Sequence, residues 1–127
     1  MSIRTHDATA ALAEEIAAAL APTGAVVVTD PEDATGHLLA GTGVVVVAPP
    51  RITSVDGSYY TLEWETPVVG APAGDKATAW RSVDAVLSVL DAHLQITRAT
   101  PITWTGAQTA QAPAYLITHT RTMIGDE

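Results

Sequence analysis

The stretch TAWRSVDAVLSVLDAHL, residues Thr78–Leu94, has the most regular hydrophobic pattern in the chain, and the fold class follows from it. Its large apolar residues recur at steps of three and four, which places them along one side of a helix of four to five turns. They are Trp80, Val83, Val86, Leu87, Leu90 and Leu94. Because such a helix needs a partner layer and β-branched segments flank it, we predict a helix over 77–94 packed on a β-sheet.

The composition indicates one small domain spanning residues 1–127, with 14 acidic against 6 basic residues and no cysteine. The acidic excess disfavours binding to nucleic acid and to anionic membranes. Without cysteine there is no disulfide and no thiolate metal site. The N-terminal MSIRTHDATAALAEE lacks the apolar core of a signal peptide, and no segment reaches the roughly 18–20 apolar residues of a membrane span. We therefore expect a soluble, unprocessed chain.

The N-terminal half is predicted to contain a helix over 8–21, capped by Asp7, and a short strand over 25–29. Residues 31–40 fit either a helical turn or a loop. Four consecutive valines at 44–47 are typical of a central strand covered on both faces.

Strands over 44–55 and 58–69 are predicted to form a hairpin about Asp56-Gly57, because a type I′ turn needs positive φ at both central residues. The proline pair 49–50 must interrupt the first strand or lie at an edge. A two-residue loop would place Val55 opposite Ser58 and Arg51 opposite Leu62. Tyr60, Leu62 and Trp64 would then share the core face with Val55, and we expect Trp80 and Leu87 of the helix to pack against it.

Two further strands are predicted over 96–105 and 114–121, joined by the uncharged loop 106–113. The complete prediction is an α+β domain. A mixed or antiparallel sheet of about four to six strands packs against two main helices.

No residue pattern indicates catalysis or metal binding. The four histidines, at 6, 37, 93 and 119, have no spacing that lets two of them share a metal, and no serine lies in a Gly-x-Ser-x-Gly sequence. The Gly41-Thr42-Gly43 turn lacks the lysine and helix start of a phosphate loop. We therefore predict no catalytic, cofactor-binding or metal-binding residue, and a protein that is not an enzyme.

Glu63 and Glu65 lie two residues apart on one strand face, so their carboxylates are about 7 Å apart. That separation suits a glycosidase or a cation site, whereas a solvated strand face or an ion pair across a subunit contact is the commoner use. We take Glu63 and Glu65, with Arg51, Tyr59 and Arg121, as candidate subunit-interface residues.

The order of these elements resembles that of the tail terminator proteins of long-tailed (siphovirus-type) bacteriophages, particularly those that infect actinobacteria. The similarity lies in Val44–Ile52 (VVVVAPPRI), in Leu62–Val69 ending Thr-Pro-Val-Val, in the helix Ala79–Leu94 and in Ala112–Thr120 (APAYLITHT). The resemblance implies a virion protein, without catalytic residues or cofactor, that caps the tail tube and ends its polymerisation. It implies assembly in the bacterial cytoplasm as a ring, usually hexameric.

The same resemblance implies three partners: further copies of the chain, the tail tube protein and the head-to-tail connector protein. DNA would pass through the ring without specific binding. Two alternatives remain at this point. One is another head-to-tail connector, tail completion or minor tail protein, and the other is a small ligand-binding or enzymatic domain, which would need a pocket with convergent polar groups.

Overall fold

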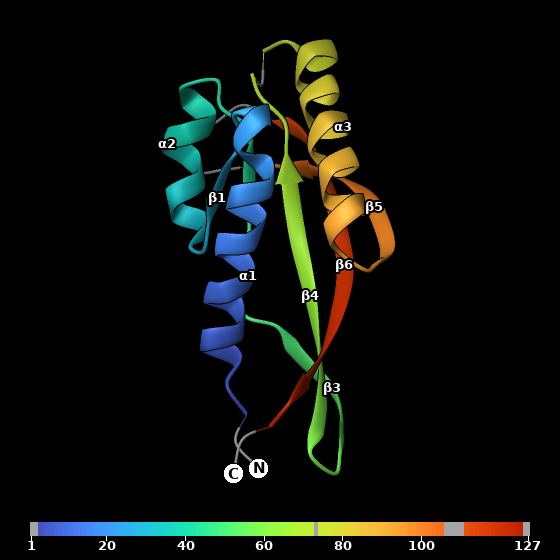
Figure 1. Cartoon of the computed structure of the whole chain (residues 1–127). Coiled ribbons are helices and arrows are strands. Elements are labelled where there is room, and N and C mark those ends of the chain that lie inside the picture. Colours follow the sequence, from blue (N-terminus) through green and yellow to red (C-terminus); the bar gives the residue numbers. More distant parts are fainter. Residues whose placement is uncertain (1–2, 73, 106–110, 126–127) are drawn as a thin grey trace.

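Two long strands, β4 (Tyr59–Val69) and β6 (Ala112–Ile124), run antiparallel side by side through the middle of the computed structural model (Figure 1). The structure describes residues 3–72, 74–105 and 111–125. Their pairing extends from Tyr59 opposite Ile124 to Val69 opposite Ala114. The two strands therefore form a continuous ladder that extends from the core to the exposed end of the molecule.

Within the described residues the sheet has six strands, in the order β1-β2-β4-β6-β5, and β3 pairs with β4 beside β2. The remaining strands are β1 (Val26–Val28), β2 (Val44–Val46), β3 (Arg51–Asp56) and β5 (Ile96–Trp104). The helices are α1 (Thr5–Leu20), α2 (Ala34–Leu39) and α3 (Lys76–His93), with 3-10 turns at Ala21–Thr23 and Pro31–Asp33. β1 and β2 are parallel and the other described pairs are antiparallel, which confirms the predicted α+β class with a mixed sheet.

Several predicted boundaries are wrong by a few residues, and one strand is divided. The predicted strand 44–55 is two strands, β2 and β3, because the prolines at 49 and 50 cannot donate to a ladder. Helix α1 begins at Thr5 without a side-chain cap, so Asp7 lies in its first turn and does not cap it. Residues 34–39 are helical, and β6 is longer than the predicted 114–121. Of the predicted loop 106–113, residues 106–110 lie outside the described residues.

The β3–β4 hairpin is present, but its predicted register is wrong. Val55 pairs with Tyr60, and the two-residue loop is Gly57-Ser58. Gly57 has a φ of 61°, and no described non-glycine residue, Ser58 included, has a positive φ. A type I′ turn needs positive φ at both central residues and a type II′ turn only at the first, so the loop matches type II′. An irregularity between Ile52 and Ser54 then sets Arg51 opposite Glu63. Because a one-residue change of register exchanges the faces of a strand, Arg51 lies on the opposite face from Leu62.

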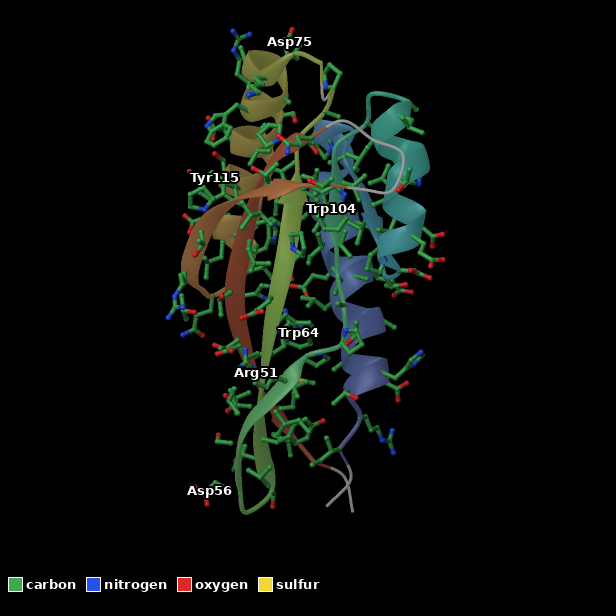
Figure 2. All side chains as sticks on the ribbon, turned by 180° about the vertical axis from the view of Figure 1, so that it is seen from behind. Arg51, Asp56, Trp64, Asp75, Trp104 and Tyr115 are labelled. Carbon is green, nitrogen blue, oxygen red and sulfur yellow. The ribbon has the colours of Figure 1, made fainter. Side chains whose placement is uncertain are left out.

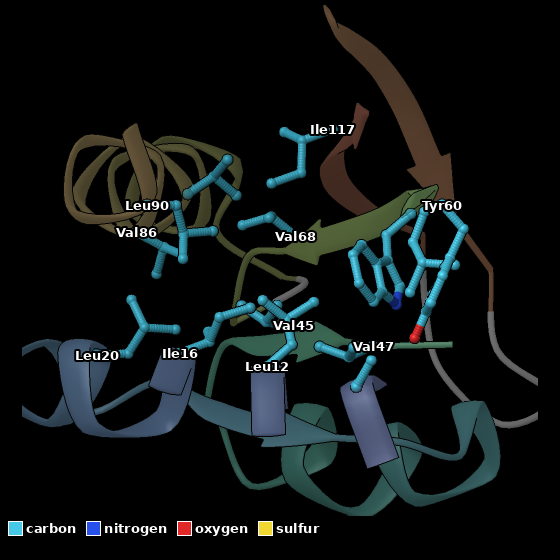
Figure 3. Close-up of a cluster of buried hydrophobic side chains, with 14 residues drawn as sticks. Leu12, Ile16, Leu20, Val45, Val47, Tyr60, Val68, Val86, Leu90 and Ile117 are labelled. Carbon is cyan, nitrogen blue, oxygen red and sulfur yellow. The ribbon is translucent and has the colours of Figure 1, made fainter. Parts of the chain in front are cut away.

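The sheet is covered by helices on both faces at one end. Figure 3 shows the larger core, in which Leu12, Ile16 and Leu20 of α1 and Val86 and Leu90 of α3 point toward side chains of the strands. The second core lies between α2 and the opposite face. It contains Val28, Ala34, Leu38, Val44, Val46, Val69, Ala71, Ala112 and Ala114. The valine run 44–47, which begins with β2, contributes to both cores: Val45 and Val47 belong to the first, and Val44 and Val46 to the second.

Helix α3 is rotated relative to the prediction, although its extent is close to 77–94. Ala79, Val83, Val86 and Leu90 are its buried residues. Trp80 is 40% exposed and packs edge-on against Tyr115, and Leu87 is only half-buried. The expectation that Trp80 packs against the core that contains Tyr60, Leu62 and Trp64 is therefore wrong, whereas Leu87 does pack against that core as a partly buried side chain.

The first turns of α3 lie directly against the end of β4. A side chain at Gly70 would collide with the backbone of Ala79 and the side chain of Val83, so only glycine permits this close approach. The carboxylate of Asp75 caps the helix by accepting hydrogen bonds from the Thr78 amide (3.1 Å) and hydroxyl (2.7 Å). These two bonds lower the pKa of Asp75, because they favour its charged form.

Candidate interaction surfaces

The distal ends of β3, β4 and β6 extend beyond the helices, as Figure 1 shows. The lengths of the elements explain this arrangement. The 11 residues of β4 extend about 37 Å, whereas the 16 residues of α1 extend about 24 Å. The helix is therefore shorter than the strand. At the Tyr59 end of β4 the side chain of Tyr60 is still buried on the helix face, whereas the opposite face, which carries Tyr59, is uncovered.

The uncovered end carries an unusual share of exposed apolar side chains. In the described part of the chain, seven large hydrophobic residues are exposed, and five of them lie at this end. We call these five the hairpin end: Ile3, Ile52, Val55, Tyr59 and Ile124. Tyr59 and Ile124 are direct cross-strand partners, and Ile3 is placed beside the hairpin because the amide of the next residue, Arg4, donates to the Tyr60 hydroxyl (3.3 Å).

Three of these five side chains are more than half exposed: Val55 at 53%, Tyr59 at 54% and Ile124 at 69%. Ile52 and Val55 share the face of Leu62 and Tyr60, whereas Tyr59 and Ile124 lie on the other face, so apolar side chains are exposed on both faces of this end. A concentration of exposed apolar side chains often marks an interaction site. Of the five residues, sequence reasoning had selected only Tyr59. The prediction that Val55 is a core residue is wrong: Val55 shares the face of Tyr60 but is exposed, and a sequence does not show where the covering helix ends.

Glu63 and Glu65 form an ion-pair cluster with Arg51 on the face of β4 opposite the larger core. The Arg51 Nη2 atom lies 3.3 Å from Glu63 Oε1 and 3.2 Å from Glu65 Oε1. Because Arg51 is on the neighbouring strand of the same chain, the two carboxylates are balanced within the molecule. The Arg51 side chain is 64% exposed, so each pair contributes at most about 1 kcal/mol to stability.

Arg121 is not part of that cluster. It pairs with Leu62 in the ladder, which puts its side chain on the helix face, and its Nη2 atom lies 3.0 Å from Glu15 Oε2 of α1. Four of the candidate interface residues therefore share one side of the β3–β4 hairpin, while Arg121 ties β6 to α1 on the other. Figure 2 shows the position of Arg51 on the hairpin, at the opposite end from Asp75.

The histidines are dispersed, and only His119 is buried. Its ring stacks on Trp64 with centroids 5.7 Å apart, and its Nε2 atom lies 2.8 Å from Thr66 Oγ1. Burial, assisted by the positive charge of Arg121, lowers the pKa of His119 from 6.5 to about 4. A neutral imidazole enclosed in this way supports packing and has no route to a substrate.

Over residues 3–72, 74–105 and 111–125, no group of three or more His, Asp and Glu side chains is placed to hold a metal ion. Gly41-Thr42-Gly43 lies in the turn before β2, with Gly41 at φ of 82°. A hollow of about 350 Å³ between α1 and the end of β2 is lined mainly by threonine, alanine, valine and proline, with the exposed His6 at its rim.

None of the described helices combines the length and the apolar character needed to cross a membrane. Neither a protein-family model nor a curated protein matches this sequence.

Proposed function

We propose that this protein is a tail terminator, a structural subunit that caps the tail tube of a long-tailed bacteriophage and ends its polymerisation. It assembles as a hexameric ring at the head-proximal end of the tail and joins the tail to the head connector. Two independent lines support the proposal. One is the resemblance in element order and local sequence, and the other is the distribution of apolar surface on the fold.

The observation that carries the proposal is the apolar hairpin end. These five residues lie outside both cores, and exposed apolar side chains gathered at one end of a molecule are typical of a surface that another protein covers. In the proposed ring, the hairpin end contacts a different surface of the neighbouring subunit. Contacts between unlike surfaces produce a ring when the rotation per subunit divides a full turn, and an open filament when it does not.

The charge distribution suits a ring through which DNA passes. The chain has a formal charge of −8, and Arg51 and Arg121 are each held by glutamates on opposite faces of the sheet. Phosphate binding depends on basic side chains that are free to replace counterions. A channel lined by such a subunit would let the duplex slide, and the proposed partners are accordingly proteins: neighbouring copies, the tube protein and the connector.

The decisive experiment is deletion of the gene in its phage, followed by electron microscopy of the particles. Abnormally long tails without heads are expected, and a plasmid-borne copy of the wild-type gene should restore normal particles. Tails of normal length that join heads would refute the assignment. Tails of normal length that fail to join heads would instead identify another connector or tail-completion protein, the nearest alternative.

A further inference from the structure

We propose that the hairpin end of one copy docks into a hollow beside Trp80 of a second copy, with Tyr59 as the inserted side chain. This inference deepens the proposed function, because it names the contact through which neighbouring subunits of the ring would touch. It is argued from the two ends of the molecule and can be tested on the isolated protein.

The receiving hollow lies where α3 meets the paired strands β5 and β6. Its volume is about 160 Å³, and its apolar lining includes Trp80, Ile102, Ala112 and Pro113. Drug-sized ligands occupy pockets of roughly 300–1,000 Å³, whereas a cavity of about 150 Å³ holds a benzene ring. The hollow is therefore suited to one aromatic side chain and too small for a typical ligand.

The hairpin end offers an aromatic side chain of that kind. Tyr59 is 54% exposed at the start of β4, and its direct cross-strand partner is Asp56. A ring and a carboxylate thus project side by side from the tip. Among the described residues that line the hollow, Lys76 is the one charged residue. Insertion of Tyr59 would bring Asp56 toward Lys76, so apolar and charged groups match at the same time.

The two surfaces cannot meet within one molecule. Figure 2 shows Asp56 at one end of the long axis and Asp75, which precedes Lys76, at the other. The hairpin end can therefore reach the hollow only in another copy of the chain, which carries the matching group. Because the two surfaces differ, the contact is head-to-tail, the type that generates rings.

Disulfide crosslinking tests the contact directly, since the chain has no native cysteine. Two single-cysteine variants are mixed and oxidised: Ser58→Cys at the hairpin loop and Thr103→Cys at the hollow. The disulfide between the two variants should form in preference to either homodimer. A matched control replaces Thr103→Cys with Ser88→Cys, which is exposed on α3 outside the hollow, and should give little crosslink.

Additional substitutions in the cysteine variants identify the side chains that hold the two copies together. Tyr59→Ser in the hairpin partner should lower the crosslink yield about tenfold, as expected for loss of a central aromatic anchor, whereas Tyr59→Phe should retain it. Asp56→Lys on one partner and Lys76→Asp on the other should each lower the yield alone and restore it when combined. Circular dichroism of each variant verifies that the fold is intact.

Predominant Ser58→Cys homodimers would show that two hairpin ends meet each other and would overturn the head-to-tail contact. A yield no greater than that of the Ser88→Cys control would overturn it as well. These outcomes are separate from the gene deletion. A head-to-tail crosslink can form even if the tails of the deletion phage are normal, and long headless tails can occur even if the subunits meet through another surface.

Discussion

The buried His119 should make the stability of the protein fall between pH 7 and pH 4.5. Its side chain is 2% exposed, and its pKa is lowered from 6.5 to about 4. Between these values the unfolded chain binds a proton that the folded chain does not, so the stabilisation is complete above pH 6.5 and is lost as the pH falls toward 4. Linkage gives a loss of about 2 kcal/mol between pH 7 and pH 4.5, and about 3 kcal/mol over the whole range.

Carboxylates also take up protons at low pH and change the stability of every variant. The prediction therefore concerns the difference in the free energy of unfolding between the wild type and a His119 variant at each pH. His119→Gln keeps a polar group near Thr66 but removes the titration and the stacking on Trp64. The variant should be less stable than wild type at pH 7. Its disadvantage should shrink by about 2 kcal/mol at pH 4.5, because only the wild type loses the histidine contribution.

Urea unfolding at both pH values, followed by tryptophan fluorescence, gives the four free energies. His93→Gln serves as the matched control, because His93 is exposed at the end of α3 and the variant keeps the buried His119. Equal losses in wild type and His119→Gln would refute the argument that burial keeps this imidazole neutral. Titration of the His119 ring signals by NMR would show the same result independently.

Two further predictions concern backbone packing and DNA. Gly70→Ala should lower the free energy of unfolding by about 1–3 kcal/mol, because the new methyl group collides with the backbone of Ala79. Gly36→Ala should raise the free energy of unfolding by about 0.5–1 kcal/mol, because Gly36 lies in α2 with open space around it. Equal denaturation midpoints for these two variants would contradict the close approach of β4 and α3. The fluorescence anisotropy of labelled duplex DNA should not change when the protein is added at physiological salt. Tight, salt-sensitive binding would contradict this prediction, because it requires a basic surface, and Arg51 and Arg121 are paired with glutamates.

The sequence by itself determined the elements and the class of the fold. The periodicity around Thr78–Leu94 located α3 to within two residues, and alternating residues located β4 and β6. These signals are local, because each depends on the spacing of side chains along one element. Even the true hairpin loop has a local signal, since Gly57-Ser58 is a typical two-residue turn, although Asp56-Gly57 was preferred.

The ion-pair cluster is a feature that the spacing of residues along one strand does not predict. Glu63 and Glu65 were correctly placed on one face of a strand, but the partner of both depends on the irregularity between Ile52 and Ser54. That irregularity moves Arg51 to the face of the glutamates. Because register depends on how two strands pair, a one-residue change is invisible in either strand alone.

Tertiary structure alone decided which apolar residues are buried. Trp80 belongs to the apolar side of α3 by spacing, yet the helix turns Val83, Val86 and Leu90 into the core and leaves the indole at the surface. Likewise, Tyr59 and Ile124 are exposed because they lie on the face of the β4–β6 pair opposite α1, at the end that the second core does not reach. Burial depends on where a second element ends and how it is rotated, and these are properties of the packed molecule that no single stretch of sequence contains.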